Sequence, residues 1–182
     1  LVGSEMCIRD RSVSCSANPT TISASGGTST LSGTASRTGT RTWSSGSTQS
    51  LNSGNQTVTN FSIVSSVTGF SISGSTVTAS SNSSTSSRSV RVRGTYGGVN
   101  SNEVTITQSG ATTTTTTEYE FSVSPTSLSF TKDGGNQTVS IVSRSRPKYT
   151  NDINGEVSYG NWSAVSYTAS STNSAFSSTT PT

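Results

Sequence analysis

The stretch that decides the fold is SRSVRVRGTYGGVNSNEVTITQ, which spans residues 87–108. Apolar and polar side chains alternate strictly at 90–93 and again at 104–107, and Gly97-Gly98 lies between the two runs. Alternation with a period of two is typical of strands that turn one face to a core and the other to water. A glycine pair between such runs favours a turn. The stretch therefore predicts two consecutive strands that share one apolar face.

Other parts of the chain extend this predicted core. A hairpin signal lies at residues 70–79, where apolar and polar residues alternate around Gly74-Ser75, and the pattern before it is weaker. The side chains predicted to point inward are Phe70, Ile72, Val77, Val90, Val92, Val104 and Ile106, with Ile22, Leu31, Trp43, Val58, Phe61 and Ile63 from the weaker part. Those predicted to point outward are Arg91, Arg93, Glu103 and Thr105.

Small hydroxyl side chains dominate the composition. The 182 residues include 44 Ser and 33 Thr, together 77 positions or about 42%. Ser and Thr compete with helical hydrogen bonds, and strong helix formers are scarce, so helix is not expected as the main architecture. The formal net charge is +3 and 10% of the residues are charged, so the chain lacks the strong self-repulsion that accompanies disorder.

The composition also excludes most catalytic chemistry. There is no histidine, which removes histidine-based acid–base catalysis, the Ser-His-Asp arrangement and the commonest zinc sites. The 8 carboxylates form no pair spaced as a catalytic dyad, and residues 133–136 offer too few carboxylates for calcium. We expect no enzyme activity, no cofactor and no metal site.

The chain repeats part of its sequence. SANPTTIS at residues 16–23 is similar to SVSPTSLS at 122–129, and Pro19 and Pro125 stand 106 positions apart. A Gly-Gly pair follows each copy. The ordered recurrence of a proline, an aliphatic residue and a glycine pair indicates two related units.

Domain boundaries follow from this repeat. Domain one is predicted at 12–110, an extended Thr-rich linker at 111–117 and an incomplete second domain at 118–182. The second domain lacks counterparts of the hairpin and closing strand of the first, so the parent protein is expected to continue past Thr182. Residues 1–11 resemble a translated sequencing-adaptor remnant and are predicted to be a non-native or disordered arm.

About 99 residues with some seven short strands fit an immunoglobulin-like β-sandwich. We therefore predict an all-β chain with two such sandwiches in tandem, the second truncated. The proline pattern, the Gly-Gly pair, one tryptophan, the run RSVRV at 88–92 and the closing run VTITQ at 104–108 resemble the BACON domain. That family is an immunoglobulin-like module of secreted Bacteroidales proteins and of phages that infect these bacteria. The resemblance implies an extracellular, cell-surface or virion-surface location and binding of glycans or mucin.

Two groups of basic residues are candidate ligand sites. Arg91 and Arg93 form a stripe on one predicted strand, and Arg144, Arg146 and Lys148 form a second cluster. They have two interpretations: binding of an acidic glycan, a nucleic-acid backbone or a phosphorylated lipid surface, or solvated outward faces that discourage edge pairing. The aromatic interleaving that single-stranded nucleic acids require is absent, so no nucleic-acid partner is expected.

Aromatic residues offer a further candidate. Tyr159-Gly160-Asn161-Trp162 places two aromatic side chains beside a flexible turn. An aromatic face stacks on a sugar ring while polar neighbours reach its hydroxyl groups; the alternative is that Trp162 belongs to a core. The candidate ligand-binding residues are therefore Arg91, Arg93, Tyr159 and Trp162.

Three hypotheses for the role remain open. The first is a non-catalytic structural or adhesion module of a larger extracellular or virion-surface protein, whose partners are glycans or mucin and the neighbouring domains of the same parent chain. The second is an accessory region of a secreted polysaccharide-degrading enzyme with its catalytic domain outside these residues. The third is a largely disordered, mucin-like chain. No run of about 18 apolar residues occurs, so no membrane insertion is expected.

Overall fold

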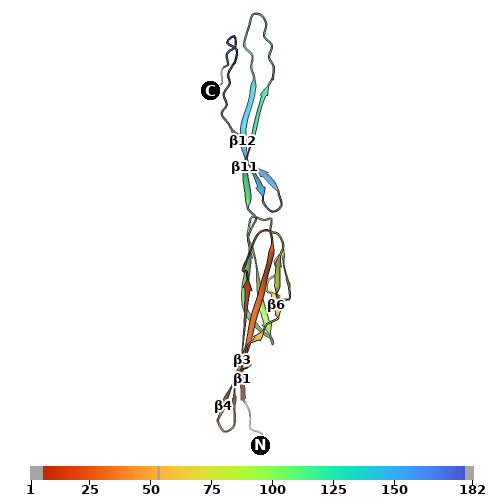
Figure 1. The fold of residues 1–182 in the computed structure, drawn as a ribbon, viewed down its shortest axis with the longest axis vertical. Helices are drawn as coiled ribbons and strands as arrows, with labels where there is room; N and C mark the ends of the chain where they lie inside the picture. The colour runs from red at the N-terminus through yellow and green to blue at the C-terminus, as the bar shows by residue number, and fades with distance from the viewer. Residues whose placement is uncertain (1–5, 53, 179–182) are drawn as a thin grey trace. The chain divides into compact units, whose positions relative to one another are not determined.

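The computed structural model describes residues 6–52 and 54–178 of the chain (Figure 1). The described residues hold 14 β-strands and no helix, which confirms the all-β prediction. The chain divides into two compact units, residues 1–112 and residues 113–182, which we call unit one and unit two. Within the described part of the chain, nothing resembles a helix of the length and apolarity that crossing a membrane requires.

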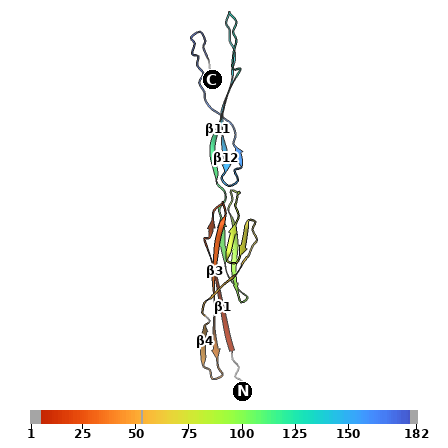
Figure 2. The ribbon, with the colours of Figure 1, turned by 45° about the vertical axis from the view of Figure 1, so that its right-hand side comes forward.

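Two sheets make up unit one (Figures 1 and 2). The first has the order β1 (Met6–Asn18), β3 (Gly27–Thr42), β8 (Thr76–Ala79) and β7 (Phe70–Ser73), and β3 also pairs with β4 (Thr48–Asn52) and β5 (Gln56–Thr57). The second has the order β2 (Thr21–Ile22), β10 (Val99–Gln108), β9 (Arg88–Tyr96) and β6 (Asn60–Ile63). All neighbouring strands run antiparallel except β2 and β10, which are parallel.

The stretch at residues 87–108 contains β9 and β10. The two strands pair antiparallel, with Val90 opposite Ile106 and Val92 opposite Val104. The hairpin signal at residues 70–79 forms β7 and β8, which also pair antiparallel. Both predicted strand pairs are therefore confirmed. Within each pair, the apolar residues lie on one face of the sheet, as the alternation requires.

The core of unit one lies between its two sheets. Its buried apolar side chains are Cys15, Leu31, Ala35, Val58, Val77 and Ala79 in or beside the first sheet, and Ile22, Phe61, Val90, Val92 and Ile106 in the second. Every residue predicted to point inward, Trp43 excepted, belongs to this core or packs against it. Two sheets that face each other across one apolar layer are consistent with a β-sandwich.

The prediction that Trp43 lies in the core is wrong, because its side chain is 37% exposed. Strand β3 pairs with β8 only at residues 27–30 but continues to Thr42. Trp43 begins the turn that joins β3 to β4, where its ring centroid lies 5.6 Å from Arg41 Cζ. Alternation along a strand identifies a face, but it does not show how far the strand extends beyond the sheet that covers it.

A buried glutamine ties the two sheets of unit one together. Gln108 is 0% exposed, and its Nε2 donates to the Ser80 carbonyl at 2.7 Å and to the Ser23 carbonyl at 3.1 Å. Its Oε1 accepts a hydrogen bond from Arg88 Nε at 2.8 Å. Since buried polar groups require partners, this network fixes Arg88 as a structural residue at the edge of the core.

Unit two consists, in its described residues, of one sheet. Its order is β11 (Thr113–Ser124), β12 (Ser140–Asn151) and β13 (Val157–Tyr159), and β14 (Ser163–Ala164) also pairs with β12. Large apolar side chains are exposed along it, among them Tyr119 at 71% and Phe121 at 64%. A sheet buries its apolar face only against a second layer, and no such layer among residues 113–178 covers these side chains. The tandem immunoglobulin-like interpretation stays a prediction.

Two segments differ from the predicted boundaries. The break between the units falls after Thr112, inside the predicted linker 111–117, but residues 113–117 belong to β11 and pair with residues 147–151. The extent of the linker is corrected accordingly: β-branched threonines favour strands once a partner strand is available. Residues 6–11 of the predicted arm lie in β1 and pair with residues 37–42, so they are strand rather than disordered arm. Their origin as an adaptor remnant stays a prediction.

Candidate functional site

Four charged side chains lie on one face of unit two. The antiparallel register of β11 and β12 places Glu118 opposite Arg146 and Glu120 opposite Arg144. Because side chains two positions apart share a face of a strand, both pairs lie on the same side of the sheet. Arg146 Nε donates to Glu118 Oε2 at 2.6 Å. Arg144 donates to Glu120 Oε2 from Nε at 3.0 Å and from Nη2 at 2.8 Å.

Two aromatic rings lie against these arginines. Tyr159 ends β13 and Trp162 stands just before β14, and both short strands pair with β12. The Tyr159 ring centroid lies 3.8 Å from Arg146 Cζ. The Trp162 ring centroid lies 4.4 Å from Arg146 Cζ and 4.5 Å from Arg144 Cζ. We call this set of six residues the arginine–aromatic face: Glu118, Glu120, Arg144, Arg146, Tyr159 and Trp162.

The connection between the two rings depends on a glycine. The Gly160 backbone N–H donates to the Pro147 carbonyl at 2.9 Å, which holds the connection against β12. A Cβ atom at Gly160 would lie 2.5 Å from Pro147 Cγ, a distance that carbon atoms do not tolerate. Glycine is therefore required here because the chain passes so close to the proline ring.

The electrostatics of the face are balanced. Each arginine is paired with a carboxylate and packs on an aromatic ring at the same time. A cation over an aromatic face is worth about 0.5–1 kcal/mol at exposed sites, and an exposed ion pair contributes about 0–1 kcal/mol. These contacts restrict the motion of Tyr159 and Trp162. The result is a surface with fixed rings and with hydrogen-bond donors and acceptors. Its four ionised groups offset one another, and Lys148, which stands opposite Tyr159 on the same side of the sheet, adds one positive charge.

The surface combines aromatic rings with hydrogen-bonding groups, which is the chemistry that sugars bind. Flat rings stack on the apolar face of a sugar, while guanidinium donors and carboxylate acceptors reach its hydroxyl groups. Tyr159 remains 46% exposed, so part of its ring is open to a ligand. Within residues 6–52 and 54–178, no group of three or more His, Cys, Asp and Glu side chains is placed to hold a metal ion.

The four candidate residues from the sequence fall into two places. Tyr159 and Trp162 meet at Arg146 in unit two, as described above. Arg91 and Arg93 lie on β9 of unit one, where Arg91 Nη1 is paired with Glu103 Oε2 at 2.8 Å. The Nε atom of Arg93 is buried and has no hydrogen-bond partner. The positive charge of the Arg91 side chain is therefore already partly satisfied inside unit one.

Sequence reasoning missed Glu118 and Glu120. It described Arg144, Arg146 and Lys148 as a basic cluster, whereas the structure pairs two of them with glutamates. The sequence did carry a signal for this pairing. Glu-x-Glu on one strand and Arg-x-Arg on the next strand both have the period of two that places side chains on one face. Only the register, however, decides that the two patterns face each other.

The buried cysteine of unit one is structural. Cys15 carries a free thiol in the core. Burial raises the pKa of this thiol, and hydrogen bonds from Ser101 and Gly94 lower it by less. Because the raised pKa keeps the thiol protonated at neutral pH, Cys15 lacks the thiolate that nucleophilic chemistry needs.

Comparison with protein-family models, with curated proteins and with solved structures found no match. The resemblance to the BACON domain thus stays a prediction.

Proposed function

We propose that this chain is a non-catalytic structural and adhesion module of a larger extracellular or virion-surface protein, and that the arginine–aromatic face of unit two binds glycans. The two units would be tandem immunoglobulin-like modules. Each begins with a long strand that ends one residue before a proline and pairs antiparallel with the strand after the Gly-Gly pair. This shared arrangement supports a repeat.

The observation that carries the glycan proposal is the packing of Tyr159 and Trp162 on two arginines that are themselves paired. Rings held in place before binding lose little conformational freedom when a ligand arrives. A neutral or weakly charged sugar suits this surface because the two glutamates offset the two arginines, which leaves Lys148 as the one further charge on this side of the sheet. A strongly acidic polymer would have to compete with Glu118 and Glu120 for the same guanidinium groups.

A glycan array probed with the full chain tests this proposal. We expect binding that Trp162→Ala reduces about tenfold or more, since a truncated aromatic anchor commonly removes that much affinity. Trp43→Ala is the matched control, because Trp43 is an exposed tryptophan that also lies against an arginine, but in unit one. If the chain binds no glycan, or if the two variants lose affinity equally, the glycan proposal is wrong and the structural role alone remains.

A charge-conserving variant separates ring positioning from simple attraction. Arg146→Lys keeps the positive charge but removes the planar group that contacts both Tyr159 and Trp162. If the rings bind the sugar, this variant weakens binding at every salt concentration. If the charge alone attracts the ligand, Arg146→Lys binds as the wild-type chain does, and binding falls steeply with salt.

A further inference from the structure

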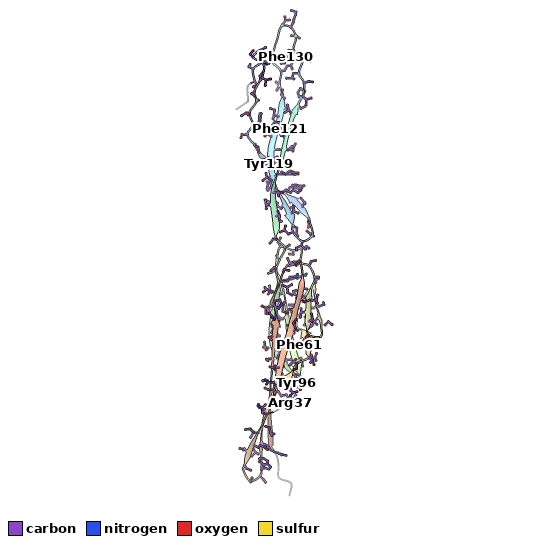
Figure 3. The ribbon with its side chains drawn as sticks, in the orientation of Figure 1. Arg37, Phe61, Tyr96, Tyr119, Phe121 and Phe130 are labelled. Carbon is purple, nitrogen blue, oxygen red and sulfur yellow. The ribbon has the colours of Figure 1, made fainter. Side chains whose placement is uncertain are left out.

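One lysine borders the arginine–aromatic face. Lys148 of β12 stands opposite Tyr159 of β13 in the antiparallel register. It lies two positions from Arg146, so both side chains project from the same side of the sheet. The rings of Tyr119 and Phe121 belong to the other side (Figure 3). Residues directly opposite each other on neighbouring strands have Cβ atoms about 4.5–5.5 Å apart, so Lys148 and Tyr159 are neighbours.

The charge of Lys148 differs from the charges of the two arginines beside it. Arg144 and Arg146 each form an ion pair with a glutamate, at 2.8 and 2.6 Å. Within the described residues 6–52 and 54–178, no carboxylate forms an ion pair with Lys148. This side of the sheet therefore carries one positive charge that no ion pair in the described part of the chain offsets.

The place of Lys148 in the sheet excludes a role in protecting an edge. A lysine that discourages pairing between sheets stands on an edge strand. At Lys148, however, β12 is paired with β11 on one side and with β13 on the other. The side chain is also partly buried, so its ammonium loses part of its hydration. A cation in the middle of a sheet without an ion pair indicates a ligand that supplies the opposite charge.

The neighbouring ring defines where that ligand lies. The Tyr159 ring packs on Arg146 and is still 46% exposed. A sugar stacked on the open part of this ring lies beside Lys148, because the two residues are cross-strand neighbours. A lysine ammonium is a compact charge with three donors on a flexible stem, so it reaches an anionic group on the stacked sugar. Thr116, opposite Lys148 on β11, adds a hydroxyl group.

The number of available charges limits the class of sugar. The guanidinium groups of Arg144 and Arg146 already bind carboxylates. A sugar with several negative charges on one ring would have to displace Glu118 or Glu120 from them. A sugar with a single anionic group needs no such exchange, because it pairs with the ammonium of Lys148.

We propose that the arginine–aromatic face selects sugars that carry one anionic group per ring, a carboxylate or a sulfate, and that Lys148 determines this specificity. The inference rests on the proposed glycan binding and adds the class of sugar to it. Tyr159 and Trp162 stack on the sugar, and Lys148 pairs with its charge. Because ion pairs of partly exposed groups are weak, the preference over the matched neutral sugar is about fivefold at low salt.

A glycan array of matched pairs, probed with the full chain, tests this specificity. The members of each pair differ in the anionic group: trigalacturonate and sialyllactose against their methyl esters, and sulfated lactose against lactose. We expect the wild-type chain to prefer the acidic member of at least one pair about fivefold, and the preference to fall as salt is raised. The pair that shows the preference identifies the group as a carboxylate or a sulfate.

Three variants assign the preference to Lys148. Lys148→Met removes the charge but keeps an unbranched side chain, and should weaken binding of the acidic member about fivefold, to the level of the neutral one. Lys148→Arg keeps the charge and should keep the preference. Lys132→Met is the matched control, because it removes the other lysine of the chain, which pairs with Asp133 between β11 and β12. It should keep the preference, and circular dichroism shows whether each variant retains its strands.

Failure of this inference differs from failure of the glycan proposal. If the wild-type chain binds both members of every pair equally, or if folded Lys148→Met keeps the preference, selection by Lys148 is wrong. Loss of the remaining binding in Trp162→Ala would then still support glycan binding by the rings. If the wild-type chain binds no sugar on the array, both inferences are wrong.

Discussion

In unit one, the pair β1 and β3 turns Cys15 and Leu31 into a core, where they are 7% and 3% exposed. In unit two, the pair β11 and β12 has the same antiparallel arrangement, yet Phe121 on the equivalent side is 64% exposed. The strand pairs themselves are long and continuous in both units. Backbone pairing is therefore the same in a buried sheet and in an exposed one. What buries the apolar side chains of a sheet is a second apolar layer packed against it.

That second layer is built by the stretch at 87–108. In unit one, β9 and β10 supply Val90, Val92 and Ile106 to the core, and Asn102 of β10 exchanges hydrogen bonds with the backbone of Cys15 at 2.9 and 3.0 Å. Unit two contains no comparable pair among its described residues. Its stability therefore rests on hydrogen bonds and on the arginine–aromatic contacts, which contribute little at exposed sites.

The largest difference in the free energy of unfolding is expected between substitutions of two isoleucines, one in each unit. Ile106→Ala creates a cavity in the core of unit one, where Ile106 is 0% exposed, and should lower the free energy of unfolding by about 2–5 kcal/mol. Ile141→Ala removes the same atoms from β12 of unit two, where the Ile141 side chain is only partly buried, and should lower the free energy of unfolding by about 1 kcal/mol or less. Urea titrations followed by circular dichroism measure both. Equal losses would mean that unit two has a core of its own.

An intermediate effect is expected at the buried glutamine. Gln108→Ala removes the acceptor of Arg88 Nε, although the Ser80 carbonyl still accepts from Arg88 Nη2 at 2.8 Å. An unsatisfied buried group costs about 1–3 kcal/mol. The control is Gln49→Ala on the exposed strand β4, which should change the free energy of unfolding by less than about 0.5 kcal/mol. If Gln108→Ala is as mild as Gln49→Ala, the network does not tie the sheets together.

The smallest effect concerns pH. Burial raises the pKa of the Cys15 thiol above its ordinary value of 9.0, so the folded state favours the neutral thiol. The resulting stabilisation is complete below the ordinary pKa and is lost as the pH rises through the raised pKa. Between about pH 7 and about pH 10, the wild-type chain should therefore lose more stability than Cys15→Ala does. Urea midpoints at the two pH values check this; identical losses would show that the thiol is not shielded from water.

Much of unit one could be predicted because its residues carry period-two signals. Val90, Val92 and Ile106 alternate with polar residues and are all buried, since alternation reports directly which face of a strand is apolar. Trp43 was misplaced because the pattern says nothing about the end of the covering sheet. The threonines of the predicted linker form a strand for a related reason. Whether β-branched residues pair depends on a partner strand, and here the paired positions, from Thr117↔Pro147 to Thr113↔Asn151, lie 30 to 38 residues apart in the chain.

The candidate site was less predictable. Tyr159 and Trp162 stand three positions apart in the sequence, and their closeness could be anticipated. Their contact with Arg144 and Arg146, and the pairing of these arginines with glutamates, depend on the register between β11 and β12. A shift of one residue would move every one of these side chains to the other face. Register is a property of the folded sheet, so composition and spacing could not determine it.

Hydrogen exchange measured by mass spectrometry on the dilute full chain tests the central comparison most directly. The account predicts that amides of residues 88–108 exchange only through global unfolding of unit one. Amides of 113–124 and 140–151, which belong to the single sheet of unit two, should exchange faster by about a hundredfold or more. Equal protection of the two regions in dilute solution would contradict the claim that only unit one has a covered sheet.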